Sequence, residues 1–148
     1  MSRVQYCLTV YGNGSQKNFD RIQKILNFAA RVIFGRRKFD HVSDLRDQLR
    51  WMTPKTMAEF QTLVTAHKAI QRGEPEVLAS MFTPNSDARA RSTRQDHHFH
   101  LPRSRLETGK RRFAHRAATL LNTLPRELVQ LPPTSFARAA KVRLVRRT

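Results

Sequence analysis

The clearest structural signal in this chain is RIQKILNFAARVIFGRRKFDHVSDLR, which runs from Arg21 to Arg46. Apolar residues recur there at steps of three and four, the spacing of one face of an α-helix. Gly35 comes directly after them, and glycine often follows the last helical residue because it tolerates positive φ. We predict a helix of roughly 16 residues from Asn18 to Phe34, with this apolar stripe: Phe19, Ile22, Ile25, Leu26, Ala29, Val32 and Ile33.

Three cations follow this helix: Arg36, Arg37 and Lys38. Cations at the C-terminal end of a helix interact favourably with the helix dipole and with its free carbonyl groups, so a structural role accounts for them, and contact with phosphate is a second role. The stretch from Gly35 to Val42 is longer than the turn of about three or four residues in a helix-turn-helix reader. We interpret residues 21–34 as a packing helix whose stripe holds the domain together.

Helical signals continue on both sides of this stretch. Residues 2–11 suit either a strand or a helix. Ser43 is predicted to cap a short helix over residues 44–50. Thr53-Pro54 combines a cap with a first-turn proline and opens a long helix that ends at Gly73, with these residues facing inward: Met57, Phe60, Leu63, Val64, His67 and Ile70.

The C-terminal half begins with a short helix from Glu76 to near Phe82. A helical pattern returns at residues 109–124 and a helical turn at 126–131. A final amphipathic segment follows, capped by Thr134 or Ser135.

These elements predict a mainly α protein, a small helical bundle of about five to seven helices with a basic, partly extended insertion near residues 84–108. The length of 148 residues is that of one domain. We divide the chain into residues 1–15, a helical part at 16–83, the basic loop or short extended segment at 84–108, and a C-terminal helical part at 109–148.

The charge of the chain points to a polyanionic partner. It has 28 Lys and Arg against 11 Asp and Glu, a net charge of +17, and such an excess disfavours a compact state unless anions neutralise it. Nucleic acid is the preferred partner, bound through backbone phosphates rather than base edges, and anionic lipid stays open. The candidate phosphate-binding residues are Arg36, Arg37, Lys38, Arg89, Arg91, Arg94, Arg103, Arg105, Lys110, Arg111 and Arg112.

The residues offer little for catalysis. Metal-dependent nucleotidyl transfer needs clustered carboxylates, and no two of the eleven acids are adjacent in the sequence. His97, His98 and His100 could contribute to a metal site, but a polar, arginine-rich loop is the preferred interpretation because further ligands are scarce. We expect His67, on the inward face of its helix, to be a hydrogen-bonded core histidine. No enzyme activity, cofactor or metal is predicted.

Only a few features of the sequence indicate the cellular compartment of the protein. Cys7 is the single cysteine, which excludes an internal disulfide and suits a reducing compartment. The N-terminal residues lack a signal-peptide pattern, and no apolar run reaches the length of about 18 residues that favours a membrane span. We expect an intracellular protein, nuclear or cytoplasmic and not secreted.

The order of short motifs along the chain resembles the region after the polymerase core in reverse transcriptases of non-LTR (LINE-type) retrotransposons, in particular Jockey-like elements and the copies called tick transposons. The resemblance covers nearly the whole chain, with one departure at Leu121, where many relatives have tryptophan. It rests on Tyr6-Cys7, Val10-Tyr11-Gly12, the stretch quoted above, LRWM at 49–52, LPRSR at 101–105, GKRRF at 109–113, LLNTLP at 120–125 and SFARAAK at 135–141.

The resemblance implies a fragment without the catalytic fingers and palm, which lie upstream in that family. The chain would correspond to the thumb and the connector after it, which help to hold template RNA and growing DNA, and residues 1–15 would be a stub of the preceding polymerase domain. The implied partners are RNA or an RNA–DNA hybrid, and an upstream polymerase domain. The expected function is thus a non-catalytic, nucleic-acid-binding remnant. The alternative is a structural interaction module that packs on a polymerase core.

Overall fold

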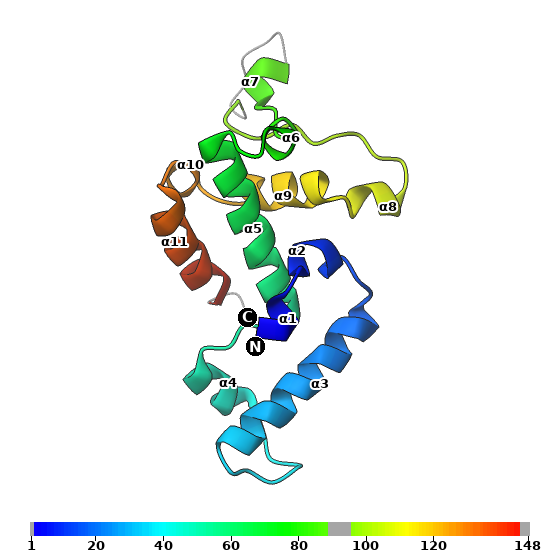
Figure 1. The fold of residues 1–148 in the computed structure, drawn as a ribbon, viewed down its shortest axis with the longest axis vertical. Coiled ribbons are helices and arrows are strands. Elements are labelled where there is room, and N and C mark those ends of the chain that lie inside the picture. The colour runs from blue at the N-terminus through cyan, green and yellow to red at the C-terminus, as the bar shows by residue number, and fades with distance from the viewer. Residues whose placement is uncertain (1, 89–95, 146–148) are drawn as a thin grey trace.

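The computed structural model of the chain describes residues 2–88 and 96–145, and these are mainly helical (Figure 1). The predicted mainly α fold is confirmed. Across the described residues there are eleven helical segments, more than predicted because most are single turns, whereas α3, α5, α9 and α11 have ten or more residues. The segments are α1 Ser2–Gln5, α2 Leu8–Tyr11, α3 Gln16–Ile33, α4 Ser43–Leu49, α5 Pro54–Arg72, α6 Glu76–Ala79, α7 Asn85–Ala88, α8 Glu107–Lys110, α9 Phe113–Asn122, α10 Arg126–Val129 and α11 Pro133–Val145.

Helix α5 runs through the centre of the molecule, with α9 and α11 packed against it (Figure 1). Its ends follow the sequence signals: the hydroxyl of Thr53 accepts a hydrogen bond from the backbone N–H of Thr56 at 3.2 Å, and Gly73 ends the helix with a φ of +69°. The main core lies between these three helices. Its buried members are Leu63, Ala66, Phe82, Ala117, Ala118, Leu121, Leu124, Phe136, Ala140 and Leu144.

His67 is a core residue, as the sequence predicted. Its ring stacks on Phe136 with ring centroids 3.8 Å apart. Its Nε2 lies 2.9 Å from the carbonyl oxygen of Val129, and because a carbonyl only accepts, Nε2 carries the proton. Nδ1 is buried and has no hydrogen-bond partner among the described residues. Burial lowers the pKa of His67 below its ordinary value of 6.5, although the Val129 carbonyl opposes this shift.

Acidification should therefore destabilise the fold through His67. The unfolded chain takes up a proton near pH 6.5, whereas folded His67 takes it up only at lower pH. Between these two pKa values the unfolded state binds more protons than the folded state. The free energy of unfolding therefore falls as the pH drops from the unfolded pKa to the folded pKa. At pH values above both pKa values, the titration of His67 does not change the free energy of unfolding. Urea unfolding at about pH 8 and about pH 5.5 measures the loss. His67→Gln keeps an N–H donor but does not titrate, so its loss should be smaller; equal losses would contradict the prediction.

Helix α2 packs against α5. Leu8 is buried in a second cluster with Met52, Met57 and Ala58. A side chain at Gly12 could not be accommodated, because its Cβ would collide with the Leu8 carbonyl oxygen and would lie 2.6 Å from the Ala58 Cβ. This glycine therefore permits the close approach of the α2 end to α5.

The prediction that the apolar stripe of α3 holds the domain together is wrong. Of that helix only Leu26 and Ala30 are buried, and Ala30 belongs to a small cluster with Val42 and Leu45 that joins α3 to α4. Most of α3 extends away from α5 (Figure 1). Periodicity shows which face of a helix can be buried, but among the described residues the stripe members Ile25, Val32 and Ile33 remain exposed.

Three predicted helix boundaries also change. Ser43 lies in the first turn of α4 after Val42, without a side-chain cap, and α11 begins at Pro133, before both predicted caps. The helix predicted over residues 109–124 is two helices, α8 and α9. They separate because the backbone of Arg112 is extended, with φ −57° and ψ 147°.

The segment predicted as a basic loop at 84–108 is ordered where the structure describes it. It contains the single turn α7, and Pro84 pairs with Phe99 in an antiparallel bridge. Asn122, at the end of α9, also holds it in place: its Oδ1 accepts from the Phe99 N–H at 2.8 Å and its Nδ2 donates to the Phe99 carbonyl oxygen at 2.9 Å. No helix among the described residues combines the length and apolar character needed to cross a bilayer.

Candidate nucleic-acid interface

The cations predicted to bind phosphate fall into three places. Arg36, Arg37 and Lys38 are exposed in the loop after α3, at the lower end of Figure 1. Arg89, Arg91 and Arg94 lie outside the described residues. The remaining five surround α8, well away from the α3 loop (Figure 1): Arg103, Arg105, Lys110, Arg111 and Arg112.

Four of these five line two adjoining cavities beside α8 and the start of α9. Arg103, Arg105 and Arg112 line the first, of about 700 Å³, and Arg111 and Arg112 line the second, of about 500 Å³. The cavities share four residues: Met81, Thr108, Arg112 and Phe113. We call these two cavities together the α8–α9 groove.

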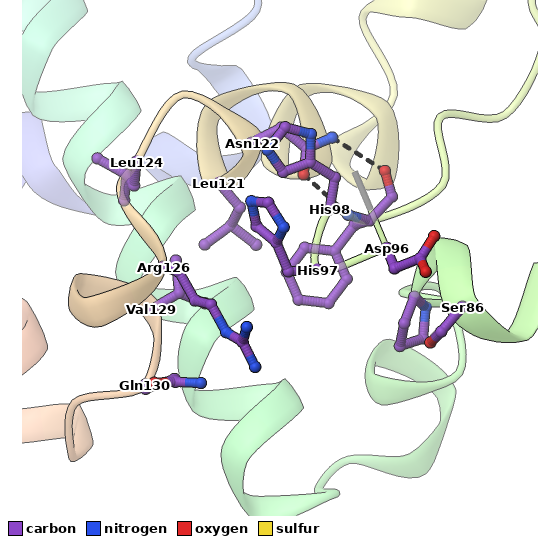
Figure 2. A pocket seen from close by; sticks show the side chains of 12 residues that line it. Ser86, Asp96, His97, His98, Leu121, Asn122, Leu124, Arg126, Val129 and Gln130 are labelled. Carbon is purple, nitrogen blue, oxygen red and sulfur yellow. Dashed lines mark hydrogen bonds between the residues drawn. The ribbon is translucent and has the colours of Figure 1, made fainter. Parts of the chain in front are cut away.

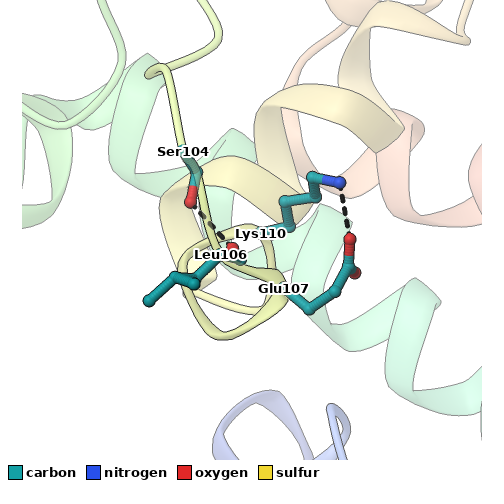
Figure 3. Close-up of polar contacts among 4 residues, drawn as sticks. All are labelled: Ser104, Leu106, Glu107 and Lys110. Carbon is teal, nitrogen blue, oxygen red and sulfur yellow. Dashed lines mark hydrogen bonds and ion pairs between the residues drawn. The ribbon is translucent and has the colours of Figure 1, made fainter.

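Local backbone structure explains how the GKRRF motif lies at this groove. Phe113 opens α9 and turns inward, with its ring 6.1 Å from that of Phe82 in an edge-to-face contact. The break at Arg112 that precedes it leaves Arg111 and Arg112 exposed at the end of α8. On the other side, the hydroxyl of Ser104 donates to the Leu106 carbonyl oxygen at 3.0 Å, which shapes the chain between Arg103 and α8 (Figure 3).

The groove arginines form no ion pair with a carboxylate of the described residues, although the charge of Arg111 acts on Glu107 nearby. Among the described residues the one ion pair joins Lys110 Nζ to Glu107 Oε1 at 2.5 Å (Figure 3). The hydrogen bond from Lys110, and then its charge, lower the pKa of Glu107, so Glu107 is ionised at neutral pH and offsets the Lys110 charge. Arg103, Arg105, Arg111 and Arg112 have no such pair with a described residue.

Arg116, only four residues after Arg112, has a structural role that the sequence analysis missed. Its Nη2 donates to the Thr9 carbonyl oxygen at 2.9 Å and to the Thr62 hydroxyl at 3.0 Å, which ties the N-terminal segment and α5 to α9. Partial burial lowers its pKa, opposed by the charge of Glu59. The sequence spacing could have indicated this role, because Arg116 lies three residues after Phe113 and therefore on the same, inward face of α9.

A further cavity, of about 510 Å³, lies between residues 84–86 and 96–99 on one side and the end of α9 with α10 on the other (Figure 2). His97 and His98 are on its wall with their rings edge to face, centroids 4.3 Å apart, and Arg126 faces them. Burial, and then the charge of His97, lower the pKa of His98. Within the described parts of the chain, no three His, Cys, Asp or Glu side chains come together as potential metal ligands.

Comparisons of this chain with protein-family models, with curated proteins and with solved structures give no match.

Proposed function

We propose that this chain is a non-catalytic nucleic-acid-binding protein. Its α8–α9 groove binds backbone phosphates of RNA or an RNA–DNA hybrid. The observation that carries the proposal is the gathering of Arg103, Arg105, Arg111 and Arg112 around two adjoining cavities, none of them in an ion pair with a described carboxylate. A guanidinium group presents several N–H donors to phosphate oxygens and remains charged at all relevant pH values.

The composition of the groove favours backbone contact. Arginine supplies charge-assisted hydrogen bonds to phosphate, and the neighbouring Met81, Leu106 and Phe113 offer apolar surface to the sugar edges between phosphates. Such contacts hold a nucleic acid without reading its sequence.

We further propose that the chain derives from a LINE-type reverse transcriptase, as a remnant of its thumb and connector. The order of the motifs supports this origin, and the same motifs divide between core and groove. Residues of LLNTLP and SFARAAK contribute Leu121, Leu124, Phe136 and Ala140 to the main core, whereas LPRSR and GKRRF contribute the arginines of the groove. A template-gripping segment needs both parts, because the core must hold the cations in one place.

The salt dependence of binding tests the nucleic-acid proposal. With four arginines on phosphates, the affinity for an RNA–DNA hybrid should fall with a slope of about −3.6 in log K against log salt, about 0.9 per phosphate. The affinity can be measured by fluorescence anisotropy over a range of salt concentrations. A slope that implies fewer than about three released counterions would contradict the proposal.

A second candidate function is a structural interaction module, which would pack on a polymerase core. One observation favours it: α3 leaves Ile25, Phe28, Val32 and Ile33 exposed. This function alone predicts weak nucleic-acid binding that changes little with salt.

A further inference from the structure

Helix α3 presents an apolar seam to solvent. Ile25, Phe28 and Val32 are each 63% exposed, although the helix buries Leu26 and Ala30 on another side. None of the cavities described above includes these three residues. The seam is therefore a convex surface along one helix and not a pocket for a small molecule.

The spacing of the seam is that of a coiled-coil contact. Ile25, Phe28 and Val32 are separated by three and then four residues, which are the a, d and a positions of a heptad repeat. This spacing matches the contact between two paired helices, and Ile33, which is 57% exposed, extends the apolar face beside it.

One edge of the seam is uniformly cationic. Lys17, Lys24 and Arg31 recur every seven residues at the g positions of the same heptad frame, where charges select the partner helix. Lys17 and Lys24 are exposed, and Arg31 uses only its Nε to bind the Asp40 carbonyl oxygen, at 3.0 Å. The other edge has Ile22 and Ala29, which are half-buried.

We propose that the α3 seam binds an α-helix of another protein that combines an apolar seam with an acidic edge. The acidic edge would pair with Lys17, Lys24 and Arg31, and the apolar seam would cover Ile25, Phe28 and Val32. A second copy of α3 in antiparallel pairing would bring these cations together. Nucleic acid supplies negative charge but no continuous apolar surface for the seam. The proposal does not depend on the α8–α9 groove.

A pair of designed helical peptides tests the proposal with the full chain. Both have about three heptads with Leu at a and d; one has Glu at every e and g position and the other has Lys. Isothermal titration should show that the Glu peptide binds at least about tenfold more tightly than the Lys peptide. Phe28→Ser should weaken binding of the Glu peptide by about tenfold or more, because it removes the largest seam residue without changing the charge.

Matched controls separate the seam from general attraction to a basic protein. Val77→Ser changes a residue that is 70% exposed on α6, at the other end of the molecule (Figure 1), and should leave peptide binding unchanged. Circular dichroism should show the same helicity and melting temperature for both variants. A Glu peptide with its apolar residues out of heptad register should bind Phe28→Ser and the parent chain equally.

Three results would overturn the proposal. The first is equal binding of the Glu peptide to the parent chain and Phe28→Ser. The second is Phe28-dependent binding to vesicles of phosphatidylcholine and phosphatidylserine without peptide binding, which would assign the seam to a membrane. The third is Phe28-dependent self-association in sedimentation equilibrium, which would assign it to a second copy.

Discussion

Phe136→Ala is expected to lower the free energy of unfolding by about 3–5 kcal/mol, the range for removing a fully buried aromatic side chain. Phe136 has no exposed surface, lies in the main core between α5, α9 and α11, and stacks on His67. Its loss would leave a cavity at the centre of the molecule and one face of the His67 ring without its neighbour. Because small domains are stable by only about 5–15 kcal/mol, this loss would be a large fraction of the total stability.

Urea unfolding followed by circular dichroism measures this loss. Phe39→Ala is the matched control, since Phe39 is 88% exposed in the loop after α3 and its truncation should change stability by less than about 0.5 kcal/mol. A loss below about 1 kcal/mol for Phe136→Ala would place the stabilising core elsewhere.

The second large effect is expected from the double variant Arg111→Ala with Arg112→Ala. If each arginine contacts one phosphate, the affinity for an RNA–DNA hybrid should fall by about 60-fold at about 0.1 M salt, because each contact contributes about 0.9 to log K per tenfold dilution of salt below 1 M. The salt slope should become shallower by about two. Both side chains are exposed, so the fold should be retained.

Arg36→Ala with Arg37→Ala makes the same change in net charge at the other end of the molecule. It should weaken binding only a few-fold if the α8–α9 groove holds the nucleic acid, because the loop after α3 lies well away from α8 (Figure 1) and salt screens exposed charges over a Debye length of about 10 Å at that salt concentration. Equal losses in the two double variants would mean that binding is spread over the whole surface. Anisotropy titrations of both proteins under identical salt decide between these outcomes.

Much of the helical fold could be predicted because its signals are local. Thr53-Pro54 and Gly73 identify both ends of α5, and Gly35 follows α3 with a φ of +61°. The break between α8 and α9 was missed because the apolar spacing over residues 109–124 is compatible with one continuous helix. It depends instead on the docking of Phe113 beside Phe82, which are 31 positions apart in the sequence.

The candidate site was predictable in composition but not in arrangement. The sequence predicted phosphate binding for the cations at 103–112 and at 36–38 alike. In the folded chain the arginines of the first group lie at one groove, whereas the second group lies apart from it. Arg116 resembles its neighbours in the sequence, yet its hydrogen bonds to Thr9 and Thr62 make it part of the framework.

Residue spacing and charge were enough to establish a mainly helical, strongly basic chain with His67 in its core, since helix periodicity, capping and net charge are properties of neighbouring residues. Tertiary structure decided which apolar faces are covered and which cations meet. The strongest apolar stripe, on α3, leaves Ile25, Val32 and Ile33 exposed, and the main core instead lies around α5. The physical reason is that burial requires a second surface, and the periodicity of a helix specifies a face without specifying its partner.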